Sequence, residues 1–204
     1  MSLWRKHATA RGGMLSRMNK AHLIYCASPE WGEVVRDRII PWASGGIDLG
    51  EDLLEIGPGP GLTTDQLRLL VPRLTAVEVD SDLATQLRTR LDGTNVTVVE
   101  ADATRLPLET GAFSSAICLT MLHHVPTAEL QDELFAEMRR AVRPGGVVIG
   151  SDSLDSPEFR SFHEDDICNP VDPGTIVARL ERAGLRDVQL ATNPFSLRFI
   201  ARVP

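Results

Sequence analysis

The chain has 204 residues, 43% of them hydrophobic and 24% charged, which is a composition typical of one globular domain. Its 28 acidic residues against 21 basic ones give a formal net charge of −7, which disfavours nucleic acid as a partner. The widely spaced Cys26, Cys118 and Cys168 form no C-x-x-C pattern, so we expect a cytoplasmic protein without a disulfide framework or a metal site. No apolar run reaches the roughly 20 residues of a membrane helix, so we expect no membrane span.

The N-terminal segment is basic and carries helix signals. Its first 29 residues contain five Lys or Arg and no Asp or Glu. This stretch fits an organelle transit peptide, a mobile basic arm or a helix that covers a site, and the sequence leaves the three open. Ser28 followed by Pro29 predicts a helix start. The apolar residues that follow on one face of this helix are Trp31, Val35, Ile39 and Trp42. We expect residues 1–48 to form an N-terminal helical lid.

From residue 50 the apolar pattern alternates between strand-like runs and helical spacing, which predicts β-α units with a largely parallel sheet. Five strands are expected at 52–56, 74–79, 95–99, 113–119 and 146–150. Between them, Ser81 is a candidate N-cap of a helix that stops near Gly93, and Thr127 is a candidate N-cap of the next helix. Residues 49–150 would form the core of the domain.

The C-terminal part, residues 151–204, begins with an acidic, irregular or partly helical connection. A short helix from Thr175 to Gly184 follows, and then two strands at 187–191 and 196–203 that are close enough to form an antiparallel hairpin at the sheet edge. The chain is therefore expected to be a single α/β domain over residues 1–204 with seven strands.

The turn after the first strand is the most informative motif. Glycine at 57, 59 and 61 lets the backbone turn sharply and lets a ligand approach closely. A dinucleotide-binding G-x-G-x-x-G motif would need a further glycine where Leu62 stands, and here Glu55 precedes the first glycine by two residues. This E-x-G-x-G-x-G turn resembles the first motif of class I S-adenosylmethionine-dependent methyltransferases.

Three further features strengthen the resemblance. Glu78, 23 residues after Glu55, stands where this family binds the ribose hydroxyls; a carboxylate offers two acceptor oxygens to a vicinal diol, and Asp80 is the competing acid. Asp102 and Ala103 look like the adenine-binding motif, in which the carboxylate accepts from the exocyclic amine and the backbone N–H serves a ring nitrogen. Arg143-Pro144-Gly145-Gly146 resembles the turn before the fifth strand of the family. Glu78 and Asp102 could instead be strand-end caps.

The resemblance implies a Rossmann-like doubly wound seven-stranded sheet with an antiparallel last strand and an N-terminal helical lid. It also implies S-adenosylmethionine as cofactor, S-adenosylhomocysteine as product, and no metal. The implied cofactor-binding residues are Glu55, Ile56, Gly57, Pro58, Gly59, Gly61, Glu78, Val79, Asp102, Ala103, Leu119 and Thr120. One departure is Ser114, since Phe-Asp is usual where this chain has Phe113-Ser114.

The acceptor side is less well defined by the sequence. His123 and His124 follow the fourth strand and are the candidate catalytic residues; His124 is a general base or a structural histidine that holds the loop. The other candidate acceptor-pocket residues are Trp4, Met14, Met18, His22, Tyr25, Phe159, Phe162, His163 and Asp165.

We expect methyl transfer to a small-molecule acceptor by direct displacement, in a monomer or homodimer. No Asn-Pro-Pro-Tyr or Asp-Pro-Pro-Tyr sequence follows the fourth strand. The alternatives are an rRNA or protein methyltransferase, a non-catalytic S-adenosylmethionine-binding regulatory protein, and a nicotinamide enzyme.

Overall fold

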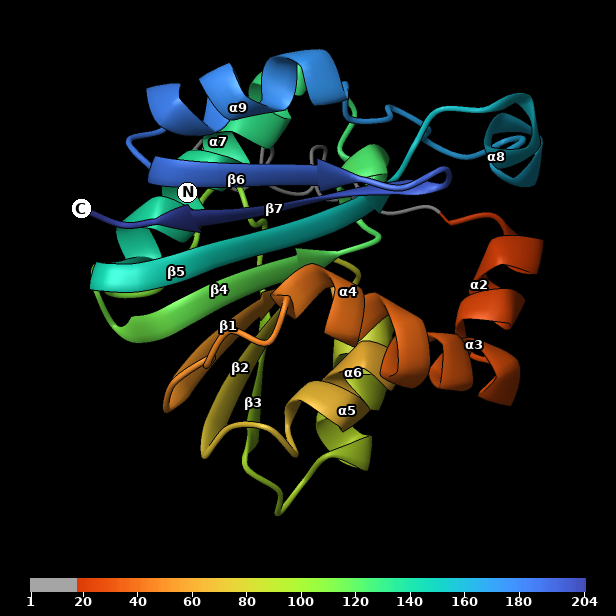
Figure 1. The fold of residues 1–204 in the computed structure, drawn as a ribbon. Helices are drawn as coiled ribbons and strands as arrows, with labels where there is room; N and C mark the ends of the chain where they lie inside the picture. Colours follow the sequence, from red (N-terminus) through yellow and green to blue (C-terminus); the bar gives the residue numbers. More distant parts are fainter. Residues whose placement is uncertain (1–17) are drawn as a thin grey trace, which may run out of the picture.

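The computed structural model describes residues 18–204, so the expectations for Trp4, Met14 and the other residues before Met18 lie outside it. The chain folds around one seven-stranded sheet (Figure 1). Its strands are β1 (Asp52–Ile56), β2 (Arg73–Glu78), β3 (Val96–Glu100), β4 (Phe113–Leu119), β5 (Val142–Ser153), β6 (Arg186–Thr192) and β7 (Ser196–Arg202). The helices are α2 (Lys20–Cys26), α3 (Pro29–Val34), η1 (Val35–Ile39), α4 (Ile40–Ser44), α5 (Leu62–Leu67), α6 (Ser81–Arg90), η2 (Leu122–His124), α7 (Ala128–Ala141), α8 (Pro157–Phe162) and α9 (Pro173–Arg182).

The strand order is β3-β2-β1-β4-β5-β7-β6, with β7 antiparallel to both of its neighbours and the other pairings parallel. This confirms the predicted Rossmann-like sheet and its antiparallel last strand. The order reverses between β1 and β4, which is where ligands bind in open α/β sheets, at the carboxyl ends of the strands.

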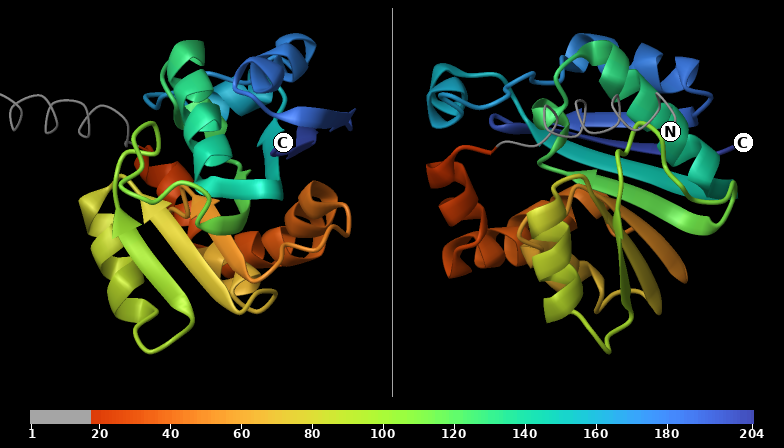
Figure 2. Two further views of the ribbon diagram at one scale, coloured as in Figure 1. Left: turned by 90° about the vertical axis from the view of Figure 1, so that its left-hand side faces the viewer. Right: turned by 180° about the vertical axis from the view of Figure 1, so that it is seen from behind.

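Helices cover both faces of the sheet (Figure 2). Helices α7 and α9 pack over one face around a core that contains Phe135 and Phe199, and the α3–η1–α4 helix, α5 and α6 cover the other face around Leu53 and Leu67. Strand β4 lies between the two cores and is buried along its whole length. None of the helices described for residues 18–204 has the length and apolar character needed to cross a membrane.

Local capping explains where several helices begin. Ser28 and Thr127 accept hydrogen bonds as the predicted N-caps of α3 and α7. The cap of α6 is Asp80 and not Ser81, because the Asp80 side chain accepts from the backbone N–H groups of the next turn. For the same reason α9 begins after Asp172, two residues before the predicted opening at Thr175.

Ser114 stands where an aspartate is usual, and it joins β4 to the segment that leads into β1. Its hydroxyl lies 2.9 Å from the backbone nitrogen of Asp52, which donates to it, and within 3.0 Å of the carbonyl of Leu49. The neighbouring Ser115 hydroxyl donates to the same Leu49 carbonyl. A hydroxyl can both accept and donate, so two serines anchor the start of β1 without a carboxylate.

Candidate active site

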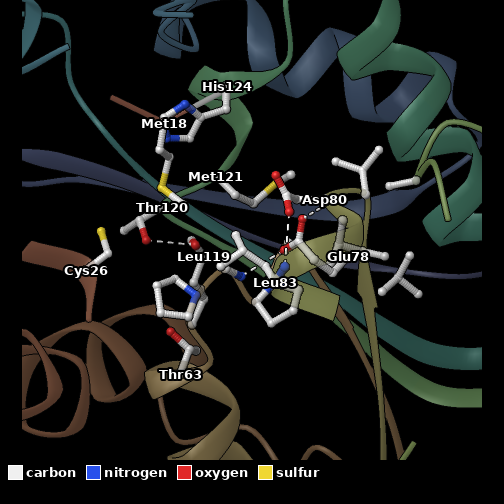
Figure 3. Close-up of a pocket in the computed structure, with 18 of the residues that line it drawn as sticks. Met18, Cys26, Thr63, Glu78, Asp80, Leu83, Leu119, Thr120, Met121 and His124 are labelled. Carbon is white, nitrogen blue, oxygen red and sulfur yellow. Dashed lines mark hydrogen bonds between the residues drawn. The ribbon is translucent and has the colours of Figure 1, made fainter. Parts of the chain in front are cut away.

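A cavity of about 400 Å³ lies at the carboxyl ends of β1, β2 and β4 (Figure 3), a volume within the usual range of ligand-binding cavities. Ten of the twelve residues predicted to bind the cofactor line it: Ile56, Gly57, Pro58, Gly59, Glu78, Val79, Asp102, Ala103, Leu119 and Thr120. His124 also lines the cavity, together with His22 from α2. Glu55, Gly61 and His123 were expected in the site but are not part of the lining.

The turn after β1 has a conformation that favours glycine. The φ angles of Gly57, Gly59 and Gly61 are 68°, 54° and 87°, in the left-handed region. A Cβ on Gly57 would lie 3.0 Å from the Met121 side chain, so a larger residue would crowd the cavity wall. A Cβ on Gly61 would lie 2.2 Å from Leu87, so this glycine serves the packing of α5 against α6. Packing is thus the physical reason why Gly61 is absent from the lining.

Glu78 connects the glycine turn to the end of β2. Its Oε2 accepts from the Gly59 backbone N–H and its Oε1 accepts from the Asp80 backbone N–H, both at 2.9 Å. The side chain is buried, and burial raises its pKa above the usual range. Each oxygen has two acceptor sites, so the carboxylate can hold the turn and still accept hydrogen bonds from a ligand's hydroxyls.

Glu55 lies below the cavity floor and is 2% exposed. Burial raises its pKa to about 8, and the nearby Glu78 carboxylate adds to the effect. Its Oε2 has no hydrogen-bond partner among the described residues. The side chain of this motif residue points into the protein because alternate residues of β1 face opposite sides of the sheet.

Asp102 combines the two roles that the sequence left open. Its Oδ1 accepts from both the backbone N–H and the hydroxyl of Thr104, which stabilises the turn after β3. Both bonds use Oδ1, so Oδ2 can accept a hydrogen bond from a ligand in the cavity that Asp102 and Ala103 line.

Thr120 follows β4 in a conformation that is rare for its residue type. Its φ is 52°, in the left-handed region that β-branched residues avoid. Hydrogen bonds hold it there: its N–H donates to Ser151 at 2.8 Å and its hydroxyl donates to Leu119 at 2.8 Å. Strained backbone of this kind is concentrated at functional sites.

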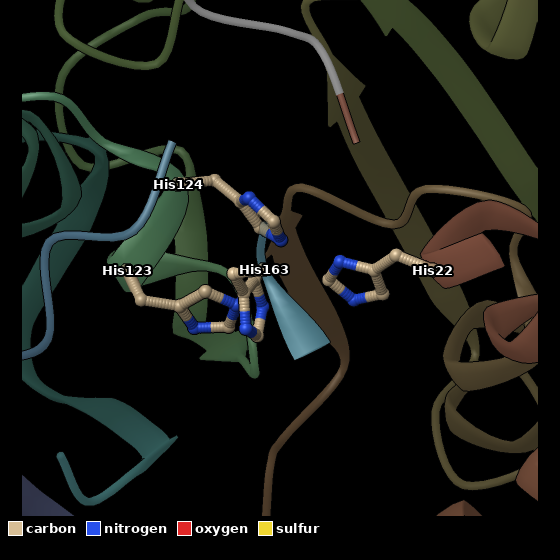
Figure 4. Close-up of side chains that lie close together, drawn as sticks. All are labelled: His22, His123, His124 and His163. Atoms are coloured by element: carbon tan, nitrogen blue, oxygen red, sulfur yellow. The ribbon is translucent and has the colours of Figure 1, made fainter. Parts of the chain in front are cut away.

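Four histidines gather beside the cavity (Figure 4). His22 comes from α2, His123 and His124 from η2, and His163 from the end of α8, and one nitrogen of each lies within 4.8 Å of those of the others. His123 is 2% exposed and absent from the cavity lining, since its ring is directed to the buried Asp152. His123, named from the sequence as a candidate catalytic residue, therefore lies outside the cavity lining.

Two carboxylates of this region were missed by the sequence analysis. Asp152, at the end of β5, and Asp166, after α8, both have fully buried side chains. The sequence pointed instead to Asp165, which is exposed and has a φ of 63°. An acidic run does not reveal which member turns inward, so the sequence held no signal that separates Asp166 from its neighbours.

Helix α2 is attached to the segment after α8, and the two lie on the same side of the molecule (Figure 1). The Asn19 side-chain amide donates to the carbonyls of Phe162 and Glu164, at 3.0 and 3.1 Å, and the Asn19 N–H donates to Asp166. This contact holds α2, which contributes His22, Leu23 and Cys26 to the lining, as one wall of the cavity.

Comparison with known proteins gives a family and a fold. Residues 54–150 match the family model described as a methyltransferase domain. The chain is 40% identical over 77 residues to ribosomal RNA small subunit methyltransferase A of Methylibium petroleiphilum, covering 38% of this chain and 29% of the relative. It is 37% identical over 110 residues to the probable enzyme of that name from Haloarcula marismortui, covering 52% and 37%. The chain therefore matches about a third of the length of these curated relatives.

Solved structures extend the likeness to nearly the whole chain. The crystal structure of a SAM-dependent methyltransferase from Aquifex aeolicus aligns with a TM-score of 0.72 at 15% identity, covering 92% of this chain and all of that one. This likeness is one of fold.

Proposed function

Through residues 54–150 the chain belongs to the class I S-adenosylmethionine-dependent methyltransferase family, and we propose that it transfers the methyl group of S-adenosylmethionine to a small-molecule acceptor. The observation that carries this proposal is the hydrogen bond between the glycine turn and Glu78 at the carboxyl ends of β1 and β2. Both groups line one cavity, and the hydrogen bond from Gly59 to Glu78 fixes their relative position.

S-adenosylmethionine is the cofactor of this family, and the cavity residues fit its three parts. Gly57 and Gly59 leave space for the methionine portion close to the backbone. Glu78 would accept hydrogen bonds from the ribose hydroxyls, and Asp102 with Ala103 would hold the adenine. When bound, the cofactor supplies an electrophilic methyl carbon on its sulfonium, and the chain's own contribution is to orient the acceptor and exclude water.

The wall of the cavity at α2 supports a small acceptor. Met18, Cys26 and Ile167 line this wall together with His22 and His124, so it is largely apolar with a few polar groups. Such a site orients a small molecule by shape and one or two hydrogen bonds. Direct displacement needs little acid-base help, so acceptor orientation beside Thr120 can supply much of the rate.

A second candidate acceptor is ribosomal RNA, which the partial likeness to small-subunit rRNA methyltransferases favours. The formal charge of −7 and the sequence after β4 support the small-molecule proposal over it. At that position the chain has Thr120-Met121-Leu122-His123 and not the Pro-Pro-Tyr motif of many enzymes that methylate amino groups of bases.

The test is transfer of labelled methyl groups from S-adenosylmethionine into a host-cell extract that is then separated into small molecules, protein and nucleic acid. Glu78→Ala is the blank. Glu100→Ala is the matched control. Glu100 lies on β3 in register with Glu78 of β2, but its side chain is exposed. Label in the small-molecule fraction, retained by the Glu100 variant and lost with Glu78→Ala, is the expected result. Label in RNA or protein would contradict the proposed acceptor class, and cofactor binding without any label would indicate a non-catalytic protein.

A further inference from the structure

Four of the chain's five histidines meet at one place although they are far apart in the sequence. Their rings are in contact: the centroids of His123 and His124 lie 4.2 Å apart, and those of His22 and His163 lie 4.6 Å apart (Figure 4). Three separate segments, α2, η2 and the end of α8, supply them. The cluster adjoins the cavity, because His22 and His124 belong to both.

Each ring turns its Nδ1 toward an oxygen acceptor. His123 Nδ1 lies 2.6 Å from Asp152 Oδ1, and His163 Nδ1 lies 2.7 Å from the Phe159 carbonyl. Asp166 faces the other two rings, with Oδ2 at 3.2 Å from His22 Nδ1 and Oδ1 at 3.6 Å from His124 Nδ1. A proton on Nδ1 that points to an oxygen leaves the lone pair on Nε2.

Three of the opposite ring nitrogens make no hydrogen bond within the described part of the chain. The Nε2 atoms of His123, His124 and His163 are buried and have no hydrogen-bond partner among the described residues. Buried polar atoms nearly always have a hydrogen-bond partner, so three unpartnered imidazole nitrogens in one cluster indicate a ligand that accepts their lone pairs. A metal cation is such a ligand, and histidines that bind one typically donate their other N–H to a carboxylate or a carbonyl.

We propose that the Nε2 atoms of His22, His123, His124 and His163 bind one divalent transition-metal ion, and that zinc is the ion the site fits. Imidazole nitrogens suit zinc, and four of them complete the tetrahedral shell that zinc prefers. The buried carboxylates of Asp152 and Asp166 balance its two positive charges. One ring nitrogen of each histidine lies within 4.8 Å of those of the others. Zinc–nitrogen bonds of about 2.0–2.1 Å set tetrahedral ligands roughly 3.4 Å apart, so side-chain shifts of about 1 Å would close the site around the ion.

The widely spaced cysteines had suggested a metal-free protein, but no thiolate is needed in a site of four histidines.

Metal binding would join α2, η2 and the end of α8 beside the cavity. It would also occupy the lone pair of His124 Nε2, so that His124 could not act there as a general base. The site is independent of the proposed methyl transfer, because metal content is measured without cofactor or acceptor.

The experiment uses the full chain without an affinity tag. After chelation and desalting, the protein is titrated with Zn²⁺, and bound metal is counted by mass spectrometry. One equivalent is expected, and Co²⁺ in its place should give the intense visible absorption of a tetrahedral ion. X-ray absorption of the zinc-loaded chain should show four nitrogen neighbours at about 2.0 Å. Failure to retain zinc at micromolar free concentration, or sulfur among the neighbours, would overturn the proposal.

Variants locate the ion. His163→Ala should lower zinc affinity at least 100-fold, and Asp152→Asn should lower it about 10- to 100-fold, since it removes only the partner of His123. Cys168→Ser is the control, because this thiol lies close to Asp166 in sequence but outside the cluster, and one equivalent should remain bound. Unchanged affinity in a His163 variant with native circular dichroism would overturn the assignment of the site, and the measurements on the unaltered chain stand whether or not a variant folds.

Discussion

The proposed contact between Glu78 and the ribose hydroxyls can be tested by a single substitution. Charged hydrogen bonds are worth about 1.5–3 kcal/mol, so Glu78→Gln should weaken S-adenosylmethionine binding about 10- to 100-fold. The backbone N–H groups of Gly59 and Asp80 each donate a hydrogen bond to the Glu78 carboxylate. In the Gln variant one of these donors would face the side-chain NH₂, which is itself a donor. Isothermal titration calorimetry measures the change, with Glu100→Gln expected to bind as the unaltered chain does. Equal affinities for both variants would remove Glu78 from the ribose site.

Glu55 makes the stability of the fold depend on pH. Burial disfavours the charged form and raises its pKa from the ordinary 4.5 to about 8 in the folded chain. The folded state therefore holds a proton that the unfolded state has lost, and stability falls as pH rises from about 4.5 to about 8. Glu55→Gln keeps a neutral side chain and should escape this loss, gaining about 4 kcal/mol at pH 8 relative to the unaltered chain.

Urea unfolding of both proteins across that pH range provides the measurement. The difference in unfolding free energy should grow with pH within the window and be absent at pH 4. A constant difference would mean that Glu55 is ionised in the folded protein. The exposed Glu100→Gln variant should show no such trend.

At the scale of elements, the neighbouring strands β5 and β7 are closely packed. A Cβ on Gly150 would lie 2.2 Å from the Phe199 ring, which is fully buried. Gly150→Ala should cost about 1–3 kcal/mol of stability through overpacking. Phe199→Leu makes space for the methyl group, so the double variant should lose less than the sum of the single losses in denaturant unfolding. Strict additivity would show that the two residues do not meet.

The elements were largely predictable, and the reasons for the errors are local. Strand β4 was predicted at its observed bounds because a run of buried residues is a strong signal. The N-cap of α6 was assigned one residue too late because Asp80 and Ser81 can both cap, and the choice depends on backbone angles. Most residues that line the cavity could be named in advance because they follow strand ends. The histidine cluster was not, because the positions of α2 and α8 depend on tertiary contacts such as those of Asn19.

For the whole molecule, ligand binding should raise the unfolding temperature. A ligand at 100 times its Kd stabilises the folded state by about 2.7 kcal/mol, which shifts Tm by about 5–10 °C for a chain of this length. S-adenosylmethionine and S-adenosylhomocysteine should both produce this shift in differential scanning fluorimetry, and NAD should produce none. A shift with NAD alone would favour a nicotinamide enzyme.

The attachment of α2 through Asn19 has a kinetic consequence. For the wall that α2 forms to move away from α8, Asn19 must release the carbonyls of Phe162 and Glu164 and the carboxylate of Asp166. Exchange of spent product for fresh cofactor on that side is thus tied to a segmental motion of the chain, and segmental motions of this kind take microseconds to milliseconds. Departure of the thioether product would then contribute to the time of each turnover, and hydrogen bonds remote from the reacting atoms would influence its rate.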